Sequence, residues 1–398
     1  MNRGALEGIR VLDLGRFLAA PWAGVLMAEL GAEVIRLERP GGESDRKLGL
    51  TALDGQGMSF HVANLNKKAI TLDIRQPRGW DILRRLVGYS DIVLENFSPG
   101  GAELAGISYE TMQEMRSDII YVSVSGFGNS GPYAQRLAFD PIVKAMSGTM
   151  SITGFPGSPP ARDGSPWVDF VTPTNAVVGA LAALYHREKT GEGQMIEAAM
   201  IDSALVIACR VFVDYMVRGV VREQMGNQSP YASQNAYQTR DGWMFLATIQ
   251  AIWKRFCRLI ERDDLVTDPR FETDALRFEN RAELDQIIQA WMGDKTSEEV
   301  SRLLEKARVP HGPVNDGPKV AADPHFRARE MIVELDYPGG EFPGKKLAVP
   351  GVPIKLSKTP GKVKSPAPKV GQDNEAIYCG LLGLSRAELD ELRAEGIV

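Results

Sequence analysis

The spacing of apolar and polar residues in the first 200 positions alternates between two patterns. Short apolar runs are typical of buried strands, and longer segments with one apolar face are typical of helices. The runs that favour strands are IRVLDL, AEVIRLE, KKAITLDI, DIVLEN and DIIYVSVSG. The segments that favour helices are PWAGVLMAELG, PRGWDILRRLV, SYETMQEM and DPIVKAMSG, the first with Pro21 suited to its start and Gly31 to its end. The alternation predicts an α/β fold with a doubly wound, Rossmann-like parallel sheet.

Five turns of that sheet are candidates for ligand binding. In doubly wound sheets, ligands bind beyond the carboxyl ends of the strands. The turns that meet this condition begin at Gly15, Arg39, Asp73, Asn96 and Gly126.

The pattern changes in the later part of the chain. TRDGWMFLATIQAIWKRFCRLI predicts a hairpin-like strand followed by a helix, and RAELDQIIQAWM and SEEVSRLLEKA predict two further helices. Thr296 with Glu299 three residues on has the pattern of a capping box. We therefore expect a large domain that begins with residues 1–205, a smaller α+β domain at 225–330, and a C-terminal part at 340–398 that returns to the large domain.

Composition and charge narrow the class of protein. A chain of 398 residues with 44% hydrophobic residues and a net charge of −5 is an ordinary globular protein, and no nucleic-acid partner is expected. Its 3 cysteines form no CxxC motif, which favours a reducing, cytoplasmic location. We identify no signal peptide, and the apolar helix after Asp169 is too short to span a membrane, so no membrane partner is expected. The 4 histidines lack metal-ligand spacing, so no metal is expected.

The first turn does not carry the signature of nicotinamide dinucleotide binding. A GxGxxG motif would let the backbone approach a pyrophosphate closely. In DLGRFLAAPWAG, Phe17 and Ala20 occupy places where that motif needs glycine. The sequence therefore disfavours a nicotinamide cofactor.

Basic residues recur near the ends of the expected strands. They are Arg16, Arg39, Arg46, Lys67, Lys68 and Arg75. Any one of them alone is most simply a solvated surface residue, but their recurrence at turns favours an anionic ligand with several phosphates. SVSGFGNSGPY, which also follows a strand, is consistent with a backbone nest for an anion and equally with an ordinary Gly-rich loop.

Asp169 is the candidate for covalent chemistry. It precedes a long apolar run in which no charged residue appears until Arg187. Thr172 as N-cap and Pro173 as first helical residue would place Asp169 just before a helix. One interpretation is a structural carboxylate favoured by the helix dipole, and the other is a nucleophile desolvated by apolar neighbours. The residues alone leave both open.

Several motifs, in order, resemble the class III coenzyme A transferases. The resemblance is strongest in LEGIRVLDLGRFLAAPWAGVLMAELGAEVIRLERPGGESDR, NKKAITLDI, ENFSPG and SVSGFGNSGPY. It continues through GSPWVDF and GALAALYHREKTGEGQMIEAAMIDSAL, and it covers essentially the whole chain. This is the CaiB/BaiF type of family, which includes formyl-CoA transferase and carnitine CoA-transferase and has α-methylacyl-CoA racemase as a relative.

The resemblance implies an acyl-CoA:carboxylate CoA-transferase. Asp169 would be its catalytic nucleophile, acting through an aspartyl anhydride and an aspartyl-CoA thioester. The implied substrates are a CoA thioester, with succinyl-CoA as the expected donor, and a small carboxylic or dicarboxylic acid as acceptor. No permanently bound cofactor is implied. The implied assembly is an interlocked homodimer.

The resemblance also implies residues that contact CoA or support the active site. The implied CoA contacts are Arg16, Leu18, Ala19, Arg39, Leu72, Arg75, Asn96 and Phe97. Asp140 matches an acidic position near the active site, and Phe139 precedes it.

Three departures from the family bear on the choice of reaction. Leu104 stands where formyl-CoA transferase has a CoA-binding arginine. Residues 226–242 lack the glycine run of the oxalate enzyme, which disfavours oxalate and formyl-CoA. Phe139 stands where the racemase has a histidine, and phenylalanine cannot carry a proton. An acyl-CoA racemase or isomerase and a non-catalytic acyl-CoA-binding protein remain the alternatives.

Overall fold

The computed structural model describes residues 4–398. Contacts between residues divide the chain into two compact units. The first unit comprises the chain up to Thr149, Gly164–Phe212 and Pro324–Val398. The second unit comprises Met150–Asp163 and Val213–Asp323.

The first unit is built on a six-stranded sheet with the order β3-β2-β1-β4-β5-β6, in which every neighbouring pair is parallel. Its strands are β1 (Arg10–Asp13), β2 (Glu33–Glu38), β3 (Lys68–Thr71), β4 (Ile92–Glu95), β5 (Ile120–Ser125) and β6 (Met195–Ala199). The expected doubly wound parallel sheet is confirmed. The hydrophobic pattern did not predict β6, because Met195 and Glu197 of this edge strand are exposed and it lacks an apolar run.

Helices cover both faces of this sheet. They are α1 (Ala19–Glu29), α2 (Met58–Ala63), α3 (Pro77–Tyr89), α4 (Gly101–Leu104), α5 (Tyr109–Met115), α6 (Asp140–Met146), α8 (Trp167–Thr190), α9 (Met200–Ile207), α16 (Pro324–Ala328) and α17 (Arg386–Ala394). Two short helices, α7 (Thr149–Ile152) and α10 (Arg210–Arg218), lie at the boundaries between the units. A 3-10 turn at Ser44–Lys47 and a π-helix at Ala376–Leu381 complete the set.

Successive residues of each strand point to opposite faces of the sheet, so the strands feed two separate cores. Val11 joins the core beneath α1 and α8, and the next residue, Leu12, joins the core beneath α3, α5 and α17. Every residue of α1 is buried, because the helix lies between the sheet and α8. Helix α1 begins at Ala19, two residues before the expected Pro21, and Gly31 follows its end with φ 110°.

Helix α8 is longer than the sequence pattern suggested. The expectation that it is too short to span a membrane is wrong, because α8 has 24 residues and a window with a mean hydropathy of 1.3. Its small residues Ala176, Ala180 and Ala183 are buried in the core of the first unit against α1 and the sheet. Small residues there allow close helix packing, which is the arrangement of a core helix.

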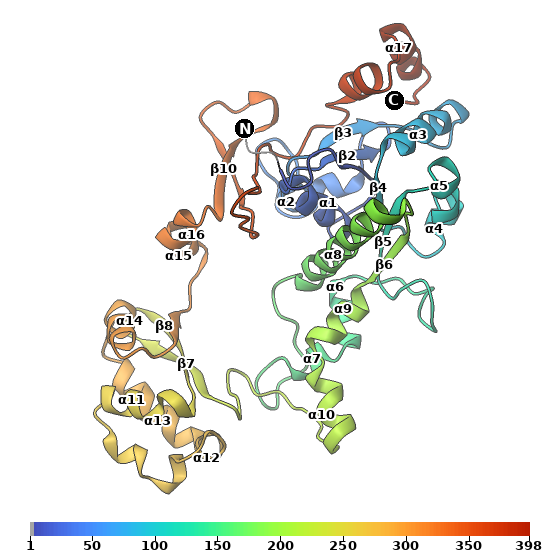
Figure 1. The fold of residues 1–398 in the computed structure, drawn as a ribbon. Coiled ribbons are helices and arrows are strands. Elements are labelled where there is room, and N and C mark those ends of the chain that lie inside the picture. Colours follow the sequence, from blue (N-terminus) through green and yellow to red (C-terminus); the bar gives the residue numbers. More distant parts are fainter. Residues whose placement is uncertain (1–3) are drawn as a thin grey trace. The chain divides into compact units, whose positions relative to one another are not determined.

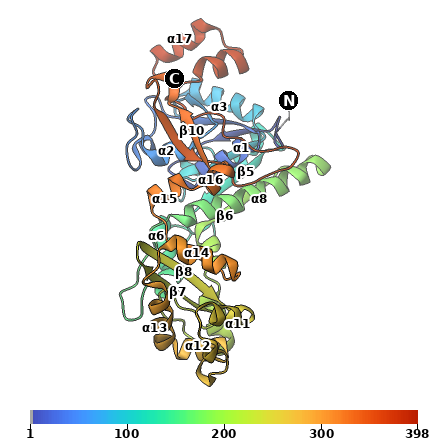
Figure 2. The same ribbon diagram turned by 90° about the vertical axis from the view of Figure 1, so that its left-hand side faces the viewer.

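The C-terminal segment closes the free edge of the sheet at β3. Asp373 Oδ2 accepts a hydrogen bond of 2.8 Å from the Ala69 N–H, and Asn374 Oδ1 accepts one of 3.0 Å from the Thr71 N–H. Unpaired strand edges favour aggregation, so these side chains protect the edge. Helix α17 lies next to α3 in both views (Figure 1), and Figure 2 shows the same neighbours from the side. Before this segment, β10 (Ile332–Asp336) and β11 (Lys346–Pro350) form an antiparallel hairpin, with a 3-10 turn at Pro338–Gly340 between them.

The second unit is a small α+β body. Its antiparallel sheet contains β7 (Ser233–Thr239), β8 (Gly242–Thr248) and β9 (His311–Pro313). Its helices are α11 (Gln250–Leu259), α12 (Asp274–Glu279), α13 (Arg281–Met292), α14 (Ser297–Lys306) and α15 (Gly317–Ala322), with 3-10 turns at Asp263–Val266 and Pro269–Phe271. The expected capping box of Thr296 and Glu299 is confirmed at the start of α14.

Candidate active site

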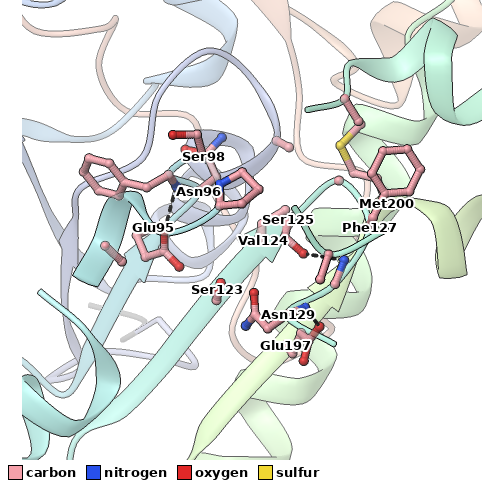
Figure 3. A pocket seen from close by; sticks show the side chains of 18 of the residues that line it. Glu95, Asn96, Ser98, Ser123, Val124, Ser125, Phe127, Asn129, Glu197 and Met200 are labelled. Carbon is pink, nitrogen blue, oxygen red and sulfur yellow. Dashed lines mark hydrogen bonds between the residues drawn. The ribbon is translucent and has the colours of Figure 1, made fainter. Parts of the chain in front are cut away.

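A cavity of about 500 Å³ opens at the point where the strand order reverses between β1 and β4. Ligands of doubly wound sheets bind at this crevice, because the connections from the two strands leave in opposite directions. Residues from the turns after β1, β4 and β5 line the cavity, together with Asp169 of α8. Figure 3 shows side chains of the β4 turn, including Asn96, and of the β5 loop, including Asn129, around the cavity.

The turns after β1 and β4 are bonded to each other across the crevice. Asn96 Oδ1 accepts a hydrogen bond of 2.7 Å from the Arg16 N–H, and Asn96 Nδ2 donates one of 2.9 Å to the Arg16 carbonyl. Phe17 has φ 61°, and its N–H donates a hydrogen bond of 2.8 Å to Asp45 Oδ2. A positive φ is unfavourable for a bulky residue, so Asp45 and Asn96 together hold this turn in shape.

A group of charged side chains lies beneath the β1 turn. We call it the buried ion-pair network: Asp13, Arg36, Glu38, Asp45, Arg46 and Lys67. Lys67 Nζ lies 2.6 Å from Asp13 Oδ2 and donates to the carbonyls of Pro21 and Ala63. Arg36 Nη2 donates two hydrogen bonds of 2.9 Å to the carboxylate of Asp45. Every charge in this network has an opposite charge beside it, which offsets the cost of burial.

The pKa values in the network follow from burial and pairing. Burial alone would raise the pKa of Asp13, but Lys67 and Arg36 hold it below its ordinary value. Burial lowers the pKa of Lys67 to about 8, against the opposing effect of Asp13. Both groups are therefore committed to each other rather than to a ligand.

The basic residues expected near the strand ends do not form one cluster. Lys67 and Arg46 are buried in the ion-pair network, so they are not free to hold phosphates as the sequence pattern suggested. Arg16 Nη2 lies 3.0 Å from Glu43, and Lys68 Nζ lies 2.6 Å from Glu33. The two that extend into solvent are Arg39 and Arg75, each paired with a nearby carboxylate.

Four of the eight expected CoA contacts line the cavity: Leu18, Ala19, Asn96 and Phe97. Arg16, Arg39 and Arg75 lie outside its lining. Leu72 is 1% exposed and packs in the core under α3, so only its backbone could meet a ligand. The assignment of all eight as CoA contacts remains a prediction.

The loop after β5 is held by its own side chains. Ser125 Oγ accepts a hydrogen bond of 3.0 Å from the Gly128 N–H, and Glu197 of β6 accepts one from the Asn129 N–H. A nest binds an anion through successive free N–H groups. Because these two N–H groups already have acceptors, one of them a carboxylate, the structure favours the Gly-rich loop over the anion nest.

Asp169 lies in the first turn of α8, two residues after the helix begins at Trp167. The expected cap at Thr172 is wrong, and Pro173 lies inside the helix. Proline has no N–H, so Pro173 cannot donate the helical hydrogen bond to the carbonyl of Asp169. The helix therefore lacks one backbone bond at the residue that faces the cavity.

The surroundings of Asp169 favour its neutral form. Burial and, after it, the negative charge of Asp140 raise the pKa of Asp169 to about 7, while Lys144 acts in the opposite direction. The ring of Phe170 packs edge-on against Trp22 at 5.1 Å, and Phe139 packs edge-on against Phe17 at 6.2 Å. At neutral pH about half of the Asp169 side chains would be ionised, and a poorly solvated anion is a strong nucleophile.

The rest of the lining limits the chemistry. The cavity lining within residues 4–398 contains no histidine or cysteine. Within the same residues, no group of three or more His, Cys, Asp or Glu side chains is arranged to hold a metal ion. Phe139, which lines the cavity and is 64% exposed, brings no proton donor or acceptor. Asp169 is therefore the candidate for covalent catalysis.

Sequence reasoning missed the residues that hold the site together. Asp45, Glu95 and Glu197 each accept a backbone hydrogen bond from a residue that lines the cavity, to Phe17, Phe97 and Asn129 respectively. One signal was present: Arg36 lies inside the apolar strand AEVIRLE, and a charge in a buried strand requires a partner.

Comparison with known proteins places this fold and site in a family. The family model for CoA-transferase family III matches residues 6–374. The chain is 38% identical to a succinyl-CoA–D-citramalate CoA-transferase of Chloroflexus aurantiacus, over 99% of this chain and 98% of that protein. It is 34% identical to a succinate–glutarate CoA-transferase of Agrobacterium fabrum, over 96% of each.

A solved structure gives the same answer for the fold. The crystal structure of a CaiB/BaiF family protein from Brucella suis matches with a TM-score of 0.84 and 32% identity, over 95% of this chain and 100% of that one. The fold is thus of the CaiB/BaiF type. The chain belongs to CoA-transferase family III, and it is a CoA-transferase.

Proposed function

We propose that this enzyme moves CoA between carboxylic acids through covalent intermediates on Asp169. The observation that carries the proposal is the state of this carboxylate. Asp169 lines the cavity at the switch point, and no hydrogen bond or ion pair from the described residues holds its side chain. A carboxylate without a partner, with a pKa raised to about 7 by burial and by Asp140, is available to attack a thioester.

The first half of the proposed reaction removes the acyl group from CoA. Asp169 Oδ attacks the thioester carbonyl carbon, the C–S bond breaks, and the CoA thiolate leaves with the electron pair. The product is a mixed anhydride between the acyl group and Asp169. The thiolate then attacks the aspartyl carbonyl carbon, the C–O bond to the acyl group breaks, and the donor acid leaves as its carboxylate. Asp169 now carries CoA as a thioester.

The second half repeats these steps in reverse with the acceptor. The acceptor carboxylate attacks the aspartyl thioester carbon and displaces the CoA thiolate, which forms a second anhydride. The thiolate attacks the acceptor carbonyl, and Asp169 leaves as a free carboxylate. One thioester is consumed and one is formed, so no external energy source is needed. The apolar walls formed by Phe17, Phe139 and Phe170 would protect the anhydrides from water.

The proposed substrates are succinyl-CoA as donor and a small dicarboxylic acid as acceptor. This choice is supported by the names of two relatives, which act on succinyl-CoA with D-citramalate and on succinate with glutarate. A cavity of about 500 Å³ offers room for the pantetheine end of CoA together with a small acid. The homodimer and the cytoplasmic location implied by the resemblance remain predictions.

The test is an exchange experiment with the purified enzyme. The enzyme is incubated with succinyl-CoA and, separately, citramalate, glutarate, malate and oxalate, and new CoA esters are identified by mass. We expect new esters with at least one dicarboxylic acid, and loss of exchange by about a thousandfold or more in Asp169→Asn. Titration with CoA should show that this variant still binds the nucleotide. Turnover of the variant above a few per cent of wild type would exclude Asp169 as nucleophile.

The same incubation in deuterated water separates transfer from racemisation. Racemisation requires an acid and a base on opposite faces of the α-carbon. Phe139 supplies neither, so a 2-methylacyl-CoA should gain no deuterium while donor and acceptor exchange CoA. Deuterium uptake at a rate similar to CoA exchange would favour the racemase alternative.

A further inference from the structure

A buried lysine lies close to Asp169 without facing the cavity. Lys144 of α6 is 0% exposed, and it is absent from the cavity lining. Burial of an ammonium group is costly, and an apolar side chain of similar length would fill the same space without that cost. The positive charge of Lys144 therefore needs an explanation beyond packing.

The contacts of Lys144 converge on the residues just before Asp169. Its Nζ lies 2.9 Å from Asp140 Oδ1, donates to the Ser165 carbonyl, and lies 5.1 Å from the ring centre of Trp167. Asp140 Oδ2 in turn accepts a hydrogen bond of 2.9 Å from the Val168 N–H. One ion pair thus holds the entry to α8 at three consecutive points.

The same pair sets the charge beside the nucleophile. Helix α8 packs against α1, α6, α9, β5 and β6. The charged residues on these elements are Asp140 and Lys144 of α6, Glu29 of α1, Asp202 of α9 and Glu197 of β6. Of these, Asp140 raises the pKa of Asp169 and Lys144 lowers it, with no contribution resolved from the others. Geometry and charge therefore lead to the same two residues.

We propose that Lys144 is a positioning residue for Asp169: through its ion pair with Asp140 it fixes the first turn of α8 and neutralises the charge next to the nucleophile. The chemical meaning of this role rests on the proposed function of Asp169. Without Lys144, the negative charge of Asp140 would stand uncompensated beside Asp169. Asp169 would then be protonated, and unreactive, over a wider range of pH.

The test measures the protonation of Asp169 directly, in wild type and in three variants. A water-soluble carbodiimide modifies protonated carboxyl groups, so the extent of labelling at Asp169 against pH, read by peptide mass, gives its midpoint. We expect Lys144→Met to raise the midpoint by about one pH unit and Asp140→Asn to lower it by a similar amount. In the double variant both charges are absent, so its midpoint should return close to that of wild type.

Turnover supplies a second readout. Lys144→Met should lower kcat about tenfold at pH 7, recover as pH rises, and leave KM for the CoA thioester nearly unchanged. The control is Lys189→Met, which removes an exposed lysine from the far end of the same helix, roughly 30 Å away by helical rise. It should shift neither the midpoint nor kcat.

The outcomes separate this proposal from the function assigned to Asp169. Equal midpoints in wild type, Lys144→Met and Asp140→Asn would overturn the role of Lys144, whatever the turnover. The expected opposite shifts, with CoA exchange preserved in Asp169→Asn, would support Lys144 and refute the nucleophile. If Lys144→Met does not fold, Asp140→Asn still decides, because an asparagine can accept the Val168 hydrogen bond.

Discussion

Two regions of the first unit bury carboxylates in opposite ways. In the buried ion-pair network, Asp13 lies 2.6 Å from Lys67 Nζ, and Asp45 receives both hydrogen bonds of one face of Arg36. At the start of α8, Asp169 has no such partner, and its nearest charged neighbours act on it in opposite directions. The first arrangement lowers the pKa of Asp13, and the second raises the pKa of Asp169 to about 7.

The difference separates a structural role from a chemical one. A paired carboxylate fixes the backbone around it, and here the network holds the turn that forms one wall of the cavity. An unpaired, poorly solvated carboxylate keeps its reactivity but costs stability. The enzyme places the two arrangements on either side of one crevice, so that a rigid wall faces a reactive group.

The largest expected effect comes from removing a partner in the network. Lys67→Met leaves Asp13 buried without its cation and leaves the Pro21 and Ala63 carbonyls without a donor. Breaking a buried pair on one side costs about 3–5 kcal/mol, so we expect a loss of that size in the free energy of unfolding. Denaturation in urea at pH 7 measures it.

The adjacent lysine is the control. Lys68 pairs with Glu33, but both side chains are part-exposed, so Lys68→Met should cost less than about 1 kcal/mol. Similar losses in the two variants would show that burial of the pair contributes nothing special, and the contrast between the two regions would fail.

The sequence predicted the frame of this comparison but not its details. The βα alternation identified the sheet and the turns at Gly15 and Asn96, because strand and helix periods are local properties. The partners in the network were not accessible in the same way, since Asp13 and Lys67 are 54 residues apart. Asp169 was identified through the family resemblance, and its place inside α8 was missed because Pro173 suggested a helix start there.

A smaller effect is expected when the unpaired charge itself is removed. The pKa of Asp169 rises from an ordinary 3.8 in the unfolded chain to about 7 in the folded enzyme. Between these values the folded state holds a proton that the unfolded state releases, so stability falls as pH rises through this window. Asp169→Asn lacks this penalty. We expect it to be more stable than wild type by about 2 kcal/mol at pH 8, allowing for partial solvation, and equal near pH 4.

Thermal unfolding at the two pH values tests this expectation. The control is Asp202→Asn on α9, whose side chain is exposed and should change stability little at either pH. A variant Asp169→Asn that is less stable than wild type at pH 8 would mean that the ionised carboxylate has a stabilising partner in solution.

The smallest effect concerns a third carboxylate that the comparison must accommodate. Glu29, the last residue of α1, is 2% exposed, and among the described residues neither of its oxygens has a hydrogen-bond partner. Burial raises its pKa to about 7, with Lys355 opposing. Electrostatically it therefore resembles Asp169, but it does not line the cavity.

Glu29→Gln tests whether an unpaired carboxylate is enough to make a site. Its raised pKa predicts the same sign as for Asp169: a gain in stability at pH 8 that disappears as pH falls towards 4. The gain should be only about 1 kcal/mol, because the buried amide also lacks partners. CoA exchange should stay at the wild-type rate, since Glu29 has no access to the substrate. A loss of exchange comparable to that of Asp169→Asn would show that the cavity does not delimit the site. An unchanged rate would show that access to the cavity, added to an unpaired charge, distinguishes the nucleophile.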